Sequence, residues 1–209
     1  GLLFYPLVIL FRSGPWQWLG VLLLATCAWR AREWSNRLTW SVVAVSGFLV
    51  TYLTLISLAG LKFDRYAVPM MPAFDILAAL GLVMTWKWAT GAYAWLRRPG
   101  WMLGLVVLAV QMVLALPHHP YYYTYFNPLM GGIREAVKVV PVGTGYEGSE
   151  RAAVYLNNLP SPERIKLATA ISSKVGPLFK GQTIAMERQS GHWLLADYTL
   201  LYVSQVQRG

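Results

Sequence analysis

Long apolar runs alternate with short polar connections over the first half of the chain. The runs cover about residues 13–29, 38–60, 68–90 and 101–116. A helix needs about 20 mostly apolar residues to cross the hydrocarbon layer of a bilayer. The pattern therefore predicts a transmembrane region over residues 1–116 with four spans.

The chain begins inside a shorter apolar run, residues 1–11, which is too short to span a membrane. A signal peptide is disfavoured because the run has no basic start and no small-residue cleavage site. We interpret the run as the remnant of a helix that begins upstream of Gly1.

Basic residues in two of the connections predict the orientation. Positive loops stay on the cytoplasmic side, so residues 62–68 and everything after Leu116 are expected outside. This predicts a multi-pass protein of the plasma (inner) membrane with an extracytoplasmic C-terminal region. The basic residues that carry the argument are Arg30, Arg32, Arg37, Lys87, Arg97 and Arg98.

The pattern changes after residue 116. Residues 117–146 are rich in Pro, Gly and Tyr and predict an ordered loop on the outer membrane surface. Residues 147–209 have the mixed periodicity of a small α/β domain. We expect helices at 149–159 and 174–180 and strands at 164–170, 183–186 and 198–203.

Composition supports a membrane protein. Hydrophobic residues make up 56% of the chain, charged residues only 13%, and the mean hydropathy is +0.43. The net charge of +9 does not indicate nucleic-acid binding, because the cations are divided between loops and the polar C-terminal region. Cys27 is the only cysteine, so the chain has neither a disulfide framework nor a cysteine-based metal site.

Two motifs are only weak evidence for a dinucleotide site or a metal site. Residues 143–148 fit G-x-G-x-x-G, but Glu163, the one acidic candidate for a dinucleotide site, precedes the strand it should follow. A turn and a helix start are the favoured interpretation. His118 and His119 lack suitably spaced partners for a metal and are expected at the membrane interface. No cofactor is predicted, and a divalent metal stays an open question.

Charges concentrate where the third span begins. Lys62, Asp64 and Arg65 precede the apolar run, and Asp75 lies six residues past Pro69, about 9 Å into the helix. A carboxylate there costs about 2–3 kcal/mol unless it is paired or faces a polar cavity.

Two interpretations of these charges remain open from the residues alone. In the first, Lys62 and Arg65 line a polar cavity, hold a phosphate and are oriented by a carboxylate. In the second, the cations reach lipid phosphates while Asp75 makes a hydrogen bond between helices.

The segment from Lys62 to Pro69, followed by Pro72 and Ala73, resembles the K-x-x-RY-x-x-P-x-x-PA segment of GT-C membrane glycosyltransferases. Within that group it is similar to family 39, which includes protein mannosyltransferases and aminoarabinose transferases. Residues 119–132, 145–148, 152–157 and 196–203 resemble later segments of bacterial members of the family.

The resemblance implies the C-terminal half of a GT-C-like enzyme that moves a sugar from a polyprenyl-phosphate donor to an acceptor at the outer face. Its catalytic base would be an acidic residue in an outer loop upstream of this chain, so we expect no catalytic residue here and no activity from this part alone. Lys62 and Arg65 match the family's basic positions and would bind the donor phosphate, with Tyr66 beside them. Asp64 and Asp75 would be supporting polar residues, and Asp64 is not expected to be the base because it neighbours Arg65.

The alternative is a non-catalytic polytopic membrane protein, either half of a transporter or an assembly subunit whose outer domain binds a partner. A transporter is expected to show paired, broken helices in two related halves. The sequence contains no such internal repeat. The expected partners under the first hypothesis are the lipid-linked sugar, membrane lipid and an unidentified acceptor.

Overall fold

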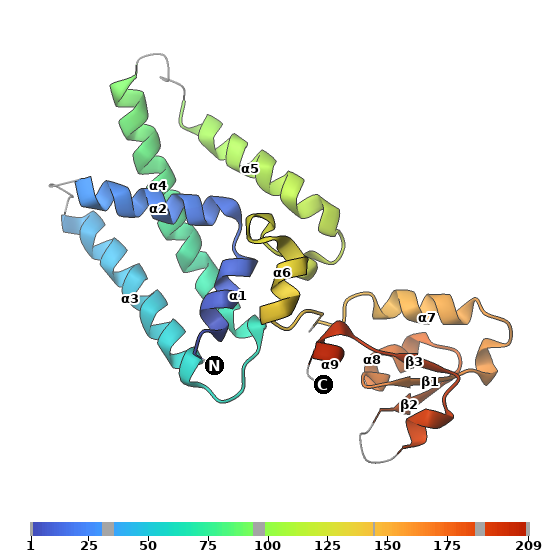
Figure 1. Ribbon diagram of the computed structural model, residues 1–209. Helices are drawn as coiled ribbons and strands as arrows, with labels where there is room; N and C mark the ends of the chain where they lie inside the picture. Colours follow the sequence, from blue (N-terminus) through green and yellow to red (C-terminus); the bar gives the residue numbers. More distant parts are fainter. Residues whose placement is uncertain (1, 31–35, 94–98, 144, 187–190, 208–209) are drawn as a thin grey trace. The chain divides into compact units, whose positions relative to one another are not determined.

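The computed structural model describes residues 2–30, 36–93, 99–143, 145–186 and 191–207 (Figure 1). It consists of two compact units, Gly1–Val140 and Pro141–Gly209. The division falls a few residues before the boundary at 146/147 that the composition suggests. Arg32, Arg97 and Arg98, which the orientation argument uses, lie outside the described residues.

The first unit is built from apolar helices. Three described segments are long and apolar enough to cross a membrane, namely Arg37–Leu58, Asp64–Ala92 and Trp101–His118. A fourth span is possible if two shorter helices are taken together. The helices are α1 (Phe4–Arg12), α2 (Pro15–Arg30), α3 (Asn36–Leu58), α4 (Met71–Ala92) and α5 (Trp101–Ala115).

The first expected span, residues 13–29, is not a complete crossing by itself. Helices α1 and α2 meet at an angle of 109°, which is the geometry of a broken span or a re-entrant loop. The break falls at Ser13, whose backbone is extended (ψ 142°), just before Gly14 and Pro15. Proline has no N–H and disfavours helical geometry in the preceding residue, so the chain turns here.

Helices α2 and α4 pack closely through glycine. A Cβ atom on Gly20 would lie 2.7 Å from the Cα of Ala78, and one on Gly81 would lie 2.6 Å from the nitrogen of Leu24. Small residues allow helix backbones to approach in membranes, where packing rather than hydrophobicity drives association. The Trp18 and Phe74 rings extend the same contact edge to face, with centroids 5.2 Å apart.

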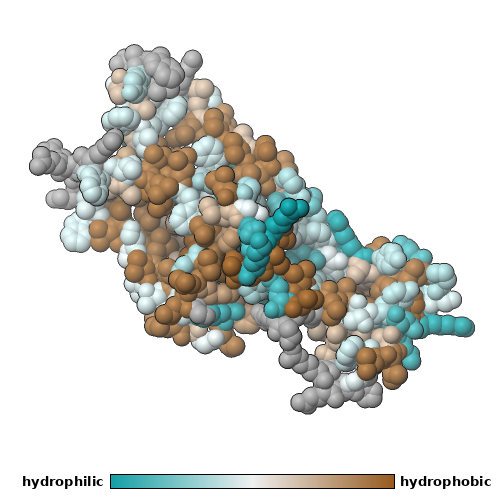
Figure 2. All heavy atoms as spheres, in the orientation of Figure 1, coloured by the Kyte–Doolittle hydropathy of each residue, from teal (hydrophilic) through white to brown (hydrophobic). Residues whose placement is uncertain are grey.

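Much of the surface of the first unit is hydrophobic (Figure 2). The apolar windows of the spans at Arg37–Leu58 and Trp101–His118 have no residue buried inside the protein. Helices of this kind satisfy their own backbone hydrogen bonds and place their side chains in lipid. These surfaces therefore support a membrane location without indicating which side each end faces.

The expected loop at 117–146 contains more regular structure than its composition suggests. It includes three short 3₁₀ turns, η3 (Leu116–His118), η4 (Tyr122–Thr124) and η5 (Pro128–Met130), and the helix α6 (Gly132–Val139). Another 3₁₀ segment, η1 (Asp64–Met70), leads directly into α4. On α6, Lys138 forms an exposed ion pair with Glu135 at 2.7 Å.

The second unit has a three-stranded parallel sheet of order β2-β1-β3. The strands are β1 (Lys166–Thr169), β2 (Gln182–Ala185) and β3 (Tyr198–Leu200). They fall inside or beside the ranges that the sequence predicts. Helical segments connect and follow them: α7 (Ser149–Asn157), η6 (Pro162–Arg164), α8 (Ser172–Val175), η7 (Gly176–Leu178), η8 (His192–Leu195) and α9 (Val203–Gln207).

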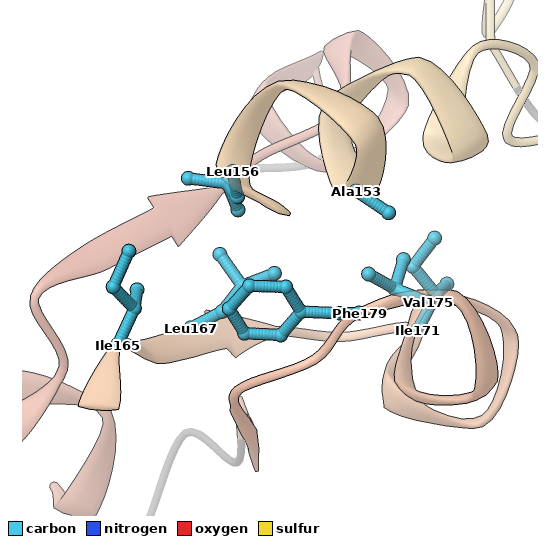
Figure 3. Packing of buried hydrophobic residues seen from close by; sticks show 7 residues of the cluster. All are labelled: Ala153, Leu156, Ile165, Leu167, Ile171, Val175 and Phe179. Carbon is cyan, nitrogen blue, oxygen red and sulfur yellow. The ribbon is translucent and has the colours of Figure 1, made fainter. Parts of the chain in front are cut away.

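The core of this unit lies between α7 and the sheet (Figure 3). Leu156 of α7 faces Leu167 of the central strand, the ring of Phe179 lies beside Leu167, and Ile171 and Val175 lie together at the side of the core. Gly148, the last glycine of the G-x-G-x-x-G motif, directly precedes α7 with a φ of +84°. The motif thus forms the predicted turn and helix start.

The α2–α4 contact gives a first prediction. Gly81→Ala places a methyl group against the backbone of α2, so we expect it to lower the free energy of unfolding by about 1–3 kcal/mol. Gly47→Ala is the matched control, because a Cβ on Gly47 of α3 meets nothing within 4 Å. Thermal stability in detergent, followed by size-exclusion chromatography, measures both. Equal stability of the two variants would contradict the close packing.

Candidate functional site

A buried ion pair joins the first helix to the charged segment. The Nη2 atom of Arg12, the last residue of α1, lies 2.8 Å from Oδ2 of Asp64, the first residue of η1. The two side chains are 12% and 4% exposed. Removing charges from water is costly, so a pair this well buried needs further hydrogen bonds to be satisfied.

Arg12 makes these hydrogen bonds with the segment that follows α5. Its Nη1 group donates to the backbone carbonyl oxygens of Tyr123 and, at 3.1 Å, Tyr125. The guanidinium carbon lies 4.2 Å from the ring centroid of Tyr123 and 4.1 Å from that of Phe126. Arg12 is thus held by charge, carbonyl oxygens and two aromatic faces.

Asn127 strengthens the same junction. Its N–H group donates to the carbonyl oxygen of Phe11 at 2.7 Å, and its own carbonyl accepts the N–H of Gly132 at 3.0 Å. The Asn127 side chain is fully buried and its Oδ1 accepts the N–H of Leu129. The start of η5 is therefore anchored to the end of α1.

A pocket of about 170 Å³ opens beside the ion pair. Its wall combines the two charged groups with three tyrosines and two apolar side chains, one from η1 and one from the start of α4. Tyr125 has a buried hydroxyl group with no hydrogen-bond partner among the described residues, and burial raises its pKa. The phenol therefore stays protonated near neutral pH and can donate a hydrogen bond. The lining residues are Arg12, Asp64, Val68, Met71, Tyr122, Tyr123 and Tyr125.

Lys62 lies at the C-terminal end of α3. Its ammonium group donates to the carbonyl oxygens of Ser57, at 2.7 Å, and Ala59, at 3.2 Å. These carbonyls lack helical partners, and a cation near them also interacts favourably with the helix dipole. The nitrogen lies 5.4 Å from the ring centroid of Tyr5.

Arg65 is exposed and lies over aromatic rings. Its guanidinium carbon is 4.7 Å from the ring centroid of Phe63 and 5.7 Å from that of Tyr66. Tyr66 is 40% exposed, and its carbonyl oxygen accepts the hydroxyl group of Tyr52 at 3.2 Å. In the part of the chain that the structure describes, Lys62 and Arg65 form no ion pair.

Asp75 is tied to α2 and not to the cations. Its Oδ1 accepts a hydrogen bond from the side-chain amide of Gln17, whose Oε1 accepts the N–H of Gly14. The side-chain oxygen of Gln111 on α5 also lies near Gly14, because a Cβ on Gly14 would be 3.4 Å from it. The structure therefore shows the interhelical hydrogen bond that was one of the two sequence interpretations of Asp75.

The sequence missed the two residues that organise this region, Arg12 and Gln17. Arg12 falls between the apolar runs at 1–11 and 13–29, and a lone cation in that position is a signal that it needs a partner. Asp64 is engaged as expected, but its side chain pairs with Arg12, while its Oδ1 accepts the backbone N–H of Arg65.

The histidines and carboxylates do not form a metal site in the described residues. No group of three or more His, Cys, Asp or Glu side chains is arranged there to hold a metal ion. His118 and His119 contact the hydroxyl groups of Thr124 and Tyr122, at 3.2 and 3.1 Å. Both belong to the short turns after α5.

Comparison with protein-family models, with curated proteins and with solved structures finds no match to this chain.

The buried pair gives a second prediction. Arg12→Met leaves the Asp64 carboxylate buried without its cation, so we expect a loss of about 3–5 kcal/mol in unfolding free energy. Lys138→Met is the control, since the exposed Lys138–Glu135 pair contributes at most about 0.5 kcal/mol. Denaturant or thermal unfolding in detergent measures both changes.

A double variant, Arg12→Met with Asp64→Leu, removes both charges of the pair. It should recover much of the stability lost in Arg12→Met alone, because no buried charge remains. An Arg12→Met effect as small as that of Lys138→Met would contradict the buried ion pair.

Proposed function

We propose that this chain is the C-terminal part of a membrane glycosyltransferase of the GT-C type, similar to family 39. The enzyme transfers a sugar from a polyprenyl-phosphate donor to an acceptor at the outer face. We further infer that the protein lies in the plasma (inner) membrane with its C-terminal unit extracytoplasmic. The catalytic acidic residue belongs to a loop upstream of this chain.

The distribution of charge around η1 is the observation that carries this proposal. Asp64 is the one carboxylate of residues 62–70, and it is neutralised by Arg12. Lys62 and Arg65 form no ion pair among the described residues and leave a net positive charge at the start of α4. An anionic ligand is the natural complement of such a segment at a membrane boundary.

A lipid phosphate fits this charge for a chemical reason. When a sugar leaves its polyprenyl phosphate, negative charge develops on the phosphate oxygen. Fixed cations stabilise that charge more than they stabilise the neutral sugar or the lipid chain. Lys62 and Arg65 are the groups proposed for this role, and the exposed Tyr66 offers a hydroxyl group beside Arg65.

The remaining polar residues support the segment and take no part in the chemistry. Asp64 fixes the start of η1 through Arg12 and through the N–H of Arg65. Asp75 and Gln17 hold α4 against α2. The pocket beside Arg12, with its tyrosine hydroxyl groups, offers room for a polar headgroup.

A non-catalytic membrane subunit is the competing function, and one observation favours it. The ammonium group of Lys62 already binds the last carbonyls of α3, which is a structural role sufficient by itself. Under that function the protein transfers no sugar, and replacing Lys62 changes only its stability.

The third prediction separates these functions in the full-length protein. Lys62→Ala and Arg65→Ala should each lower sugar transfer from a polyprenyl-phosphate donor on the order of 10²-fold, because each removes a charge that stabilises the leaving phosphate. Lys62→Arg should restore part of the activity. Lys138→Ala, an exposed cation on α6, should leave the rate unchanged.

Measuring the melting temperature of each variant distinguishes a lost contact from a lost fold. Transfer rates of Lys62→Ala and Arg65→Ala equal to the wild-type rate, in stably folded protein, would remove both residues from the proposed phosphate site. A full-length protein with no transfer activity toward any polyprenyl-phosphate sugar would favour the non-catalytic alternative.

A further inference from the structure

The C-terminal unit carries an apolar turn that none of the preceding interactions uses. In η8, Leu194 and Leu195 are neighbours and are each 70% exposed, and Trp193 before them is half-buried. The turn is held by the N–H of Leu194 on the carbonyl of Gly191, at 3.0 Å. Two adjacent exposed leucines on a short, hydrogen-bonded turn form a projecting apolar tip.

The tip lies where the strands of the sheet begin. Helix turn η8 packs against β1 and β2 and leads directly into β3. Asp197, just before β3, accepts the N–H of Lys166 at 2.8 Å and donates its own N–H to the carbonyl of Lys166 at 2.9 Å. Because the three strands are parallel, all of them start at this same end of the sheet, which we call the η8 edge.

Basic side chains lie at the same edge as η8. Arg164 and Lys166 stand at the start of β1, Lys180 stands just before β2, and all three are exposed. The nearby carboxylates are those of Glu163 and Asp197, and Asp197 is already engaged with a backbone N–H. The edge therefore has a small excess of positive charge among its described residues.

The opposite end of the sheet lacks this combination of charges. Glu147 and Glu150 lie near Tyr202, where they raise the pKa of its phenol, although burial of that phenol is the larger cause. Arg151 and Lys174 balance these two carboxylates. An anionic surface is thus attracted to the edge that carries η8 more than to the other end.

We propose that this basic and apolar edge (Arg164, Lys166, Lys180 and residues 193–195) docks on the surface of an anionic bilayer. The chain enters this unit at Pro141 directly from a unit with membrane-length helices, so the two units are covalently joined. A domain of about 70 residues has a radius of gyration of only about 11 Å, so no face of this unit is far from the residue at which the chain enters it. A combination of Trp, Leu and basic residues is typical of protein segments that bind the membrane–water interface.

The test uses the whole chain with an environment-sensitive dye. In a Cys27→Ser background, Leu194→Cys is labelled with a nitrobenzoxadiazole dye and reconstituted into vesicles of phosphatidylcholine, with or without phosphatidylglycerol. Ser173→Cys is the matched control, because Ser173 is exposed on α8, beyond the other end of β1. Emission wavelength and quenching by nitroxide-labelled lipid are measured for both sites.

Docking predicts a blue-shifted, lipid-quenched dye at residue 194 and a water-like dye at residue 173. Phosphatidylglycerol should strengthen the quenching several-fold, and salt or the pair Lys166→Glu and Lys180→Glu should weaken it to a similar extent. A water-like dye at residue 194 in both kinds of vesicle would overturn the proposal. So would a blue shift without lipid quenching, which indicates that protein covers the tip, either the first unit or a second copy.

Discussion

The ion pair between Arg12 and Asp64 is the interaction on which the structure of the first unit depends. Two charges buried beside membrane-length helices are tolerated only when each is paired and hydrogen-bonded. The pair meets this condition by recruiting the carbonyl oxygens of Tyr123 and Tyr125. It thereby joins the end of α1, the start of η1 and the segment after α5, which lie far apart in sequence. The sharp turn at Ser13 and Gly14 is what brings Arg12 to this point.

Because Asp64 pairs with Arg12, the positive charges near the start of α4 are left for the proposed ligand. With Asp64 committed to Arg12, Lys62 and Arg65 have no carboxylate partner in the described part of the chain. Asp75 is engaged with Gln17, which lies beyond the break on α2, and this hydrogen bond holds α4 against α2. The proposed ligand-binding residues Lys62 and Arg65 are thus separated along the chain from Asp75 by about a dozen residues. The proposed phosphate site and the membrane architecture follow from the same arrangement.

The sequence predicts those features that depend on local pattern. Apolar length identified the spans at 38–60, 68–90 and 101–116, and periodicity identified the three strands and α7. It missed the break before Pro15, although proline there is a local signal, because an apolar run on each side of it outweighed the signal. The pairing of Arg12 with Asp64 spans 52 residues, and that of Gln17 with Asp75 spans 58. Which distant residues pair depends on how the helices pack, and no local sequence pattern specifies that packing.

Selective binding of a lipid phosphate tests the central claim most directly, because it requires only this chain. Native mass spectrometry of the purified protein can compare a polyprenyl phosphate with the polyprenol of the same chain length. A phosphate site at Lys62 and Arg65 predicts a clear preference for the phosphate that disappears in Lys62→Gln with Arg65→Gln and persists in Lys138→Gln. Equal binding of phosphate and alcohol by the wild-type protein would contradict it.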